Sequence, residues 1–189
     1  MNNNNSLKNN SLKNKRIAMI ATDGFEQSEL LQPKQNLTAL GAEIDVVSID
    51  NNQEICGWDV NKWGDKVKVD KQIGDITLSD YDGIIFPGGQ INPDVLRTNK
   101  EVVSLIQKAT KQDNIKVIAA ICHGPWLLVE ADIVKNKKVT SFPSIRTDLK
   151  NAGAHWEDKK VVVDGKLITS RNPDDIPAFV DAIAYQLTH

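Results

Sequence analysis

The chain has little cysteine and histidine. Two cysteines, Cys56 and Cys122, and three histidines occur among its 189 residues. Their spacing fits no zinc or other metal motif, so we predict no metal site. We also expect no disulfide, because the N-terminus lacks the apolar stretch of a secretory signal and intracellular thiols stay reduced. These absences predict a cytoplasmic protein that holds no metal.

Long hydrophobic runs and a strong charge imbalance are also missing. The formal net charge is −2, which gives no reason to expect general affinity for nucleic acid. No apolar run approaches the ~20 residues that a membrane-spanning helix needs. The Gly-rich turn Pro87-Gly88-Gly89-Gln90 lacks the lysine and the spacing of a phosphate-binding loop. The sequence therefore predicts neither a membrane partner nor a specific nucleic-acid partner.

Residues 1–15 differ in composition from the rest of the chain. They are rich in asparagine and lysine and contain few large apolar side chains. Such a segment buries too little surface to offset the entropy that it loses on ordering. We therefore expect a disordered tail over 1–15 and a single domain over 16–189, which is long enough for one full hydrophobic core.

From residue 16 onward, short apolar runs alternate with segments of helical pattern. The apolar runs predict strands at 17–21, 43–49, 83–86, 117–121, 139–142, 161–163 and 166–170. The helical patterns lie at 26–40, at 100–112, from 125 onward and after the capping residue Asn172. Turn-rich residues 54–70 are expected to form two short strands or a hairpin. The alternation predicts an α/β domain, in which helices cover both faces of a mostly parallel sheet.

Three loops that follow predicted strands are expected to meet. In sheets of this kind, ligands bind beyond the carboxyl ends of the strands. The loops at 22–26, 87–89 and 122–124 all leave such ends. We therefore expect the functional site where these loops come together.

Cys122 is the strongest candidate for a catalytic residue. An apolar run ends on it, and Gly124-Pro125 then turns the chain into a helix. Free N–H groups and the dipole at a helix N-terminus favour a thiolate. A buried structural cysteine is the alternative. We favour a nucleophile, because strand-to-helix elbows expose nucleophiles in this way.

The neighbours of the elbow offer candidate partners. His123 reaches the Cys122 thiol only if the chain bends sharply between them. Otherwise its ring contacts the substrate and its backbone N–H stabilises an oxyanion. Gly88 and Gly89 follow a predicted strand and let backbone N–H groups approach a ligand, which suits an oxyanion hole. A plain tight turn is the alternative interpretation of this glycine pair.

Acidic residues supply further candidates. Glu26 begins the first predicted helix, where its carboxyl is placed to hydrogen-bond the thiol and tune its pKa. Glu29, one turn later, is the weaker candidate, and either acid can instead complement the helix dipole. His155 and Glu157 have the spacing of a His-x-Glu pair that completes a Cys-His-Glu triad. We favour solvent-facing side chains for this pair, since such residues are usually exposed.

Several motifs resemble, in the same order, those of the PfpI family, within the superfamily of the Parkinsonism-associated deglycase. The nucleophile elbow of that family is similar to Ala120-Ile121-Cys122-His123-Gly124-Pro125. Further segments that resemble it are Asp23–Leu30, Gly57-Trp58 with Trp63-Gly64, Phe86–Gly89, Asn92–Asp94, Asn151–Ala154 and Ser170–Asp175. The resemblance extends from Arg16 to the C-terminus. It implies a flavodoxin-like three-layer sandwich, as in class I glutamine amidotransferases.

The resemblance also implies a site. Cys122 is then the nucleophile with His123 beside it, and Glu26 is the carboxyl that touches the thiol. No cofactor is implied. A homodimer or larger homo-oligomer is implied, in which an acid from the adjacent subunit orients the histidine, and Asp94 occupies that position here. Members of the family are described as peptidases, glyoxalases and deglycases, all of which begin with thiolate attack on a carbonyl carbon.

We predict a cysteine-dependent enzyme of carbonyl stress, acting on methylglyoxal or its protein adducts. Its partner is then a small carbonyl compound or a glycated protein. Aldehydes react with thiolates far more readily than amides do, and a peptidase needs a dependable general acid for its amine leaving group. The alternatives are an intracellular peptidase of the PfpI type and a non-enzymatic redox sensor or chaperone that uses the same thiolate.

Overall fold

The computed structural model describes residues 11–189, and the part of the predicted tail at 1–10 lies outside the described residues. Leu12 is fully buried, and its N–H donates a 2.8 Å hydrogen bond to the carbonyl of Leu40. Lys15 pairs with Asp82, with 3.0 Å between Nζ and Oδ1. The expected disorder is therefore wrong for residues 11–15, because one buried leucine anchors this polar segment.

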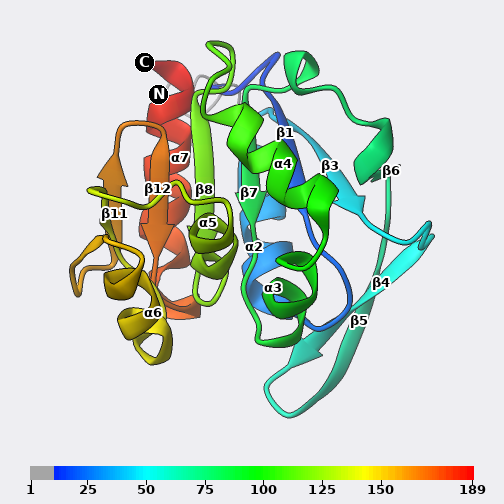
Figure 1. The fold of residues 1–189 in the computed structure, drawn as a ribbon. Helices are drawn as coiled ribbons and strands as arrows, with labels where there is room; N and C mark the ends of the chain where they lie inside the picture. Colours follow the sequence, from blue (N-terminus) through cyan, green and yellow to red (C-terminus); the bar gives the residue numbers. More distant parts are fainter. Residues whose placement is uncertain (1–10) are drawn as a thin grey trace, which may run out of the picture.

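A seven-stranded sheet forms the centre of the domain, in the order β11-β12-β8-β7-β1-β3-β6 (Figure 1). Its strands are β1 (Arg16–Ile20), β3 (Glu43–Ser48), β6 (Lys71–Gln72), β7 (Gly83–Phe86), β8 (Val117–Ile121), β11 (Val161–Asp164) and β12 (Leu167–Ser170). Neighbouring strands are parallel, apart from the antiparallel pair of β11 and β12. The predicted mostly parallel sheet is confirmed. The two-residue strand β6 was too short for an apolar run to reveal.

Helices cover both faces of this sheet, which makes the flavodoxin-like sandwich of three layers (Figure 1). One face packs against α2 (Gln27–Ala39) and α7 (Ile176–Thr188). The other packs against α3 (Ile91–Leu96), α4 (Lys100–Ala109), α5 (Pro125–Glu130) and α6 (Arg146–Asn151). Strand β1 shows the alternation, since Ile17 and Met19 belong to the first layer's core and Ala18 and Ile20 to the second's. The described residues also form single 3-10 turns: η1 (Ile73–Asp75), η2 (Leu78–Asp80), η3 (Pro143–Ile145) and η4 (Pro173–Asp175).

Two smaller sheets flank the central one. Strands β2 (Phe25–Glu26), β4 (Glu54–Asp59) and β5 (Lys62–Lys68) form the first, and the predicted hairpin at 54–70 is confirmed as the antiparallel pair of β4 and β5. Strands β9 (Lys138–Val139) and β10 (His155–Trp156) form the second. The strand expected at 139–142 is therefore shorter, spans Lys138–Val139 and lies outside the central sheet, where it pairs with β10.

Candidate active site

Cys122 lies at a sharp elbow between strand β8 and helix α5. Its φ of 62° is in the left-handed region, which costs a residue with a side chain roughly 1–2 kcal/mol. The surrounding backbone holds the elbow in place: the N–H of Cys122 donates to Ser170 at 3.0 Å, and its carbonyl accepts from Phe142 at 2.8 Å. The predicted elbow is thus present, and a strained residue at this position presents its side chain beyond the end of the sheet.

The three loops expected to meet do so around this elbow. The N–H of Glu26 donates to the carbonyl of Gly88 at 3.3 Å. A Cβ added to Gly88 would lie 2.6 Å from the Cβ of Cys122, so only glycine allows this close approach. Gly89 has a φ of +83°, and its own added Cβ would lie 2.7 Å from the backbone nitrogen of Glu26. Packing therefore requires both glycines, and backbone conformation also requires Gly89.

The carboxyl beside the thiol belongs to Glu29. This residue is fully buried, and its Oε2 accepts a 2.8 Å hydrogen bond from the N–H of Gly88. Its Oε1 has no partner of suitable geometry within residues 11–189, although the carboxyl faces the Cys122 thiol. Burial, with a contribution from the charge of Glu26, raises the pKa of Glu29 to about 8. Glu29 is therefore largely neutral at pH 7 and carries a proton to donate.

The structure contradicts the expectation that Glu26 touches the thiol. The acid beside the thiol is Glu29, about one helical turn later in the sequence. Glu26 lies in β2, before α2 begins at Gln27, and is only half-buried. Its Oε1 accepts a 3.0 Å hydrogen bond from the hydroxyl of Ser28. The start of the helix turns Glu29 inward and leaves Glu26 on the wall of the cavity described below.

Opposing effects act on the thiol of Cys122. Burial is the largest and raises its pKa, and a negative charge on Glu29 raises it further. The N–H groups of Gly89 and His123 point at the sulfur and lower the pKa. In the neutral form of Glu29 the repulsive charge is gone, and its O–H becomes a third group able to donate to the thiolate. Protonated Glu29 therefore favours the thiolate that ionised Glu29 opposes.

The same N–H groups define a candidate oxyanion hole. Those of Gly89 and His123 donate to no other backbone carbonyl in the described part of the chain. The N–H of Gly88 is instead committed to Glu29. The predicted oxyanion hole of Gly88, Gly89 and His123 is therefore reduced to the last two residues. The N–H of Gly88 orients the buried acid instead.

The side chain of His123 turns back toward the thiol of the preceding residue, Cys122. Its Nδ1 lies 3.2 Å from the sulfur of Cys122, and its Nε2 lies 3.1 Å from the hydroxyl of Ser144. The ring stacks on Phe142 with 4.9 Å between centroids, and the edge of Trp126 packs against it. Burial lowers the pKa of His123, which favours the neutral ring. With its proton on Nε2, the ring donates to Ser144 and accepts the thiol proton at Nδ1.

Ser144 was not predicted from the sequence as a site residue, and Asn92 entered only within the family-like segment Asn92–Asp94, with no role of its own. Asn92 is fully buried and accepts a 2.8 Å hydrogen bond from the N–H of Thr22. It donates to the carbonyls of Pro87 and Gly88 at 3.0 and 3.1 Å, and so ties two of the three loops together. Each of the two residues lies in or beside a helix of six residues or fewer, too short for a periodic pattern to mark.

A cavity of about 340 Å³ opens from the thiol. Its polar groups come from Glu26, Glu29, Gln90, Cys122 and His123. Its apolar walls are Trp58, Val60, Ile91, Phe142 and Pro173. Asp94 is exposed on α3 and is not among the lining residues, so its action on the histidine of an adjacent subunit stays a prediction.

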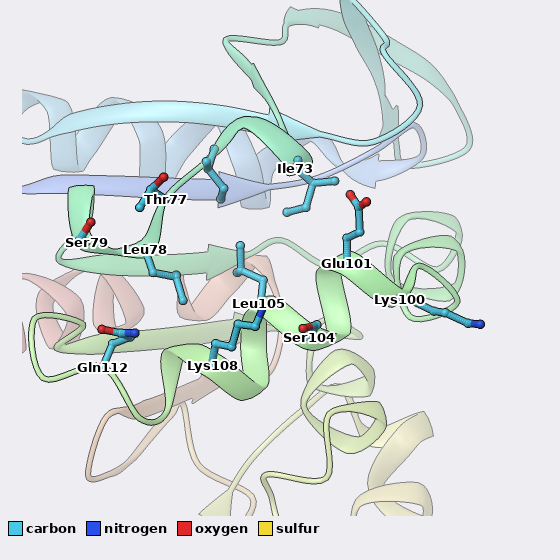
Figure 2. Close-up of a pocket in the computed structure, with 12 residues that line it drawn as sticks. Ile73, Thr77, Leu78, Ser79, Lys100, Glu101, Ser104, Leu105, Lys108 and Gln112 are labelled. Atoms are coloured by element: carbon cyan, nitrogen blue, oxygen red, sulfur yellow. The ribbon is translucent and has the colours of Figure 1, made fainter.

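A larger hollow lies elsewhere, and among the described residues it is lined by neither cysteine nor histidine. It measures about 590 Å³ and lies between η1, η2 and α4. Figure 2 shows side chains such as Leu78, Leu105 and Lys108 pointing into it, and neither cysteine nor histidine is among its lining residues. We therefore assign the chemistry to the smaller cavity.

Other candidate groups lie apart from the site. His155 is exposed, and Glu157 pairs with Lys159, which agrees with solvent-facing side chains. Cys56 and Cys122 are both free thiols. Residues 11–189 contain no cluster of three or more His, Cys, Asp or Glu able to hold a metal ion. None of the helices in this range has the length and apolar character of a membrane span.

Comparison with known proteins places this geometry in context. The profile of the DJ-1/PfpI family matches residues 15–186. YraA of Bacillus subtilis, whose name marks it as a supposed cysteine protease, is 39% identical over 165 residues, which are 87% of this chain and 94% of that protein. Protein/nucleic acid deglycase 2 of Escherichia coli is 38% identical over 166 residues, which are 87% of this chain and 93% of that protein.

Solved structures show the same fold. A protein of Anabaena variabilis with a DJ-1/ThiJ/PfpI-like and a ferritin-like domain matches with a TM-score of 0.86 and 34% identity. The match covers 93% of this chain and 48% of that one, so the similarity spans about half the length of the two-domain protein.

Proposed function

Because this chain belongs to the DJ-1/PfpI family, we propose that it is a cysteine-dependent enzyme that converts methylglyoxal or the adducts it forms on proteins. One observation carries the proposal. The Cys122 thiol, on its strained elbow, faces a neutral buried acid, a neutral imidazole and two free N–H groups at the mouth of a cavity. The name deglycase of a relative that is 38% identical supports this reaction class.

The first step is addition of the thiol to an aldehyde carbon. Nδ1 of His123 takes the thiol proton across 3.2 Å, and the sulfur forms a bond to the carbon. The carbonyl π electrons move to oxygen, and the resulting alkoxide is stabilised by the N–H groups of Gly89 and His123. Protonation of that oxygen gives a hemithioacetal. No leaving group departs in this step.

The second stage converts the hemithioacetal of methylglyoxal into lactate. A proton leaves the former aldehyde carbon and another reaches the former ketone carbon, which yields a lactoyl thioester on Cys122. The first carbon is oxidised and the second reduced, so no external oxidant or cofactor takes part. Water then cleaves the thioester, releases lactate and restores the thiol. Glu29 and His123 are the two groups placed to move these protons.

A peptidase is the second candidate, supported by the name of YraA. Peptide cleavage needs a histidine that protonates a departing amine. Here burial lowers the pKa of His123, and its Nε2 meets the hydroxyl of Ser144 rather than a carboxylate. A neutral histidine that meets no carboxylate of its own chain is a poor general acid for an amine, which supports aldehyde chemistry.

We further propose that the enzyme works in the cytoplasm, where its two free thiols stay reduced, and as a homo-oligomer. Ile91 and Val95 on α3 leave 42% and 38% of their surface exposed. These apolar side chains beside the cavity support association with a second copy.

The experiment that separates the reaction classes uses one preparation and three assays. Lactate formation from methylglyoxal, amine release from a methylglyoxal adduct and cleavage of unmodified peptides are measured in parallel. The proposal expects one or both of the first two and no peptide cleavage beyond background. Peptide cleavage as the dominant activity, lost in Cys122→Ala, would establish the peptidase instead.

A further inference from the structure

Glu26 lines the cavity without taking part in the thiol contact. Its carboxylate is half-buried, and its hydrogen-bond partner is the hydroxyl of Ser28, 3.0 Å away. None of the ion pairs within residues 11–189 includes it. A carboxylate in this position therefore places at the cavity a negative charge that no cationic side chain of the described residues pairs with, although it stands at the N-terminus of α2.

Among the described residues, no positively charged side chain that lines the cavity balances this negative charge. Within the described residues, neither lysine nor arginine is among those that line it. Glu29 is the second acid of the lining and is neutral below a pH of about 8. Trp58 and Phe142 contribute aromatic rings to the walls, and such rings attract cations.

We propose that Glu26 determines substrate specificity by charge, so that the cavity accepts neutral and cationic carbonyl compounds and excludes anionic ones. The excluded class comprises 2-oxo acids and carbonyl compounds that bear a phosphate group. The favoured class comprises uncharged aldehydes and carbonyl compounds attached to a group that keeps a positive charge. The inference rests on the proposed function only in one respect, namely that the group of the substrate that reacts with Cys122 is a carbonyl.

Electrostatics gives the direction and the size of the effect. One negative charge within several ångströms of a bound charge, partly shielded by water, changes the relative binding of cation and anion by roughly tenfold or more. In Glu26→Gln the amide oxygen can still accept the hydrogen bond from Ser28, although more weakly than the carboxylate does.

The test measures access to Cys122 with two reagents that differ in charge. Methanethiosulfonates carrying a trimethylammonium-ethyl or a sulfonate-ethyl group react by attack of the thiolate on sulfur, which forms a mixed disulfide and releases methanesulfinate. Rates are measured at pH 7 in a Cys56→Ser background, so that one thiol reacts. Each rate is divided by the rate of the same reagent with 2-mercaptoethanol, a small neutral thiol.

We expect this normalised ratio of cationic to anionic reagent to be about tenfold or more, from the electrostatic argument above. Glu26→Gln should lower the ratio several-fold, and Glu26→Asp, which keeps the charge, should retain most of it. Asp65→Asn is the matched control, since Asp65 is an exposed acid of the same small sheet that does not line the cavity. A ratio that is unchanged in Glu26→Gln, with the circular dichroism of the folded protein, overturns the proposal.

The ratio, unlike a single rate, is insensitive to the protonation of the thiol. Glu26→Gln also removes a charge that raises the pKa of Glu29, but this changes the thiolate fraction equally for both reagents. Comparing turnover of methylglyoxal with that of 4,5-dioxopentanoate, a 2-oxo aldehyde that also carries a carboxylate, then separates the two proposals. A protein that selects reagents by charge but turns over no carbonyl compound would refute the proposed function and leave the charge selection by Glu26 standing.

Discussion

Glu29 and Gly88, which are 59 residues apart in the sequence, are joined by a hydrogen bond of 2.8 Å from the glycine N–H to Oε2 of the carboxyl. This contact fixes the acid and leaves Oε1, without a partner in the described part of the chain, for the thiol side. It also explains why residue 88 is glycine, since any side chain there would collide with the acid and with Cys122. The reactivity of the thiol therefore depends on a loop and a helix that meet only in the folded protein.

Replacing Glu29 should change how stability depends on pH. The folded state raises the pKa of Glu29 to about 8 from an ordinary 4.5. The protonated carboxyl therefore adds to the free energy of unfolding in full below pH 4.5, and this stabilisation is lost as the pH rises through about 8. Relative to the wild type, the free energy of unfolding of Glu29→Gln should therefore rise by on the order of 4 kcal/mol between pH 5 and pH 9. Urea unfolding at several pH values measures this difference. Glu54→Gln, at an exposed site, should show no such trend, and a flat difference for Glu29→Gln would refute the assignment.

Adding a methyl group at Gly88 should destabilise the fold. The new Cβ would lie 2.6 Å from Cys122 Cβ and 2.9 Å from the carbonyl oxygen of Ile121, and overpacking of this kind costs roughly 1–3 kcal/mol or more. Gly74→Ala is the control, because its nearest neighbour would be a side-chain oxygen of Glu101 at 3.7 Å. We expect that change to stay within about 0.5 kcal/mol. Equal losses in the two variants, measured by urea unfolding, would contradict the packing at the elbow.

Asn92 should matter for activity beyond its effect on stability. Asn92→Ala removes the side chain that joins the loops at 22–26 and 87–89 and should cost roughly 2–4 kcal/mol of stability. Asn114 makes two comparable donations, to the carbonyls of Leu78 and Tyr81, away from the cavity. At a temperature where both variants are fully folded, Asn92→Ala should lose kcat and Asn114→Ala should retain it. Retained kcat in both would show that the loop positions do not matter for the reaction.

The hydroxyl of Ser144 should tune the orientation of His123. Its loss in Ser144→Ala removes the 3.1 Å contact to Nε2, while the aromatic packing of the ring remains. We expect kcat to fall by about three- to tenfold with little change in KM, as is usual for a group that positions a general base. Ser104→Ala, which alters the separate hollow of Figure 2, should leave both constants unchanged. A normal kcat in Ser144→Ala would mean that Phe142 and Trp126 alone hold the ring.

The sequence predicts the sheet and the elbow because both are local patterns. The apolar run that ends at Cys122 and the Gly124-Pro125 turn after it lie within nine residues, and the structure confirms strand, elbow and helix there. Buried strands with helices between them identify a parallel sheet in the same way. Leu12 shows the limit of composition, since a single leucine in a polar segment is enough to anchor it.

The wrong choice between Glu26 and Glu29 has a different cause. Both acids stand at the start of one helix, and the residue that faces inward depends on where that helix begins and how it lies on the sheet. Asn92 and Ser144 act through contacts with loops 70 and 21 residues away. The motif Asn92–Asp94 marks the position of Asn92 but not its distant partner, and no local pattern marks Ser144, because such partners are set by tertiary structure.

The most direct test of the account measures lactate formation from methylglyoxal by Cys122→Ala beside Cys56→Ala. Each variant removes one of the two free thiols, so the two proteins differ only in which sulfur remains. The account predicts wild-type turnover for Cys56→Ala and no lactate above background for Cys122→Ala. Substantial lactate formation by folded Cys122→Ala would contradict it.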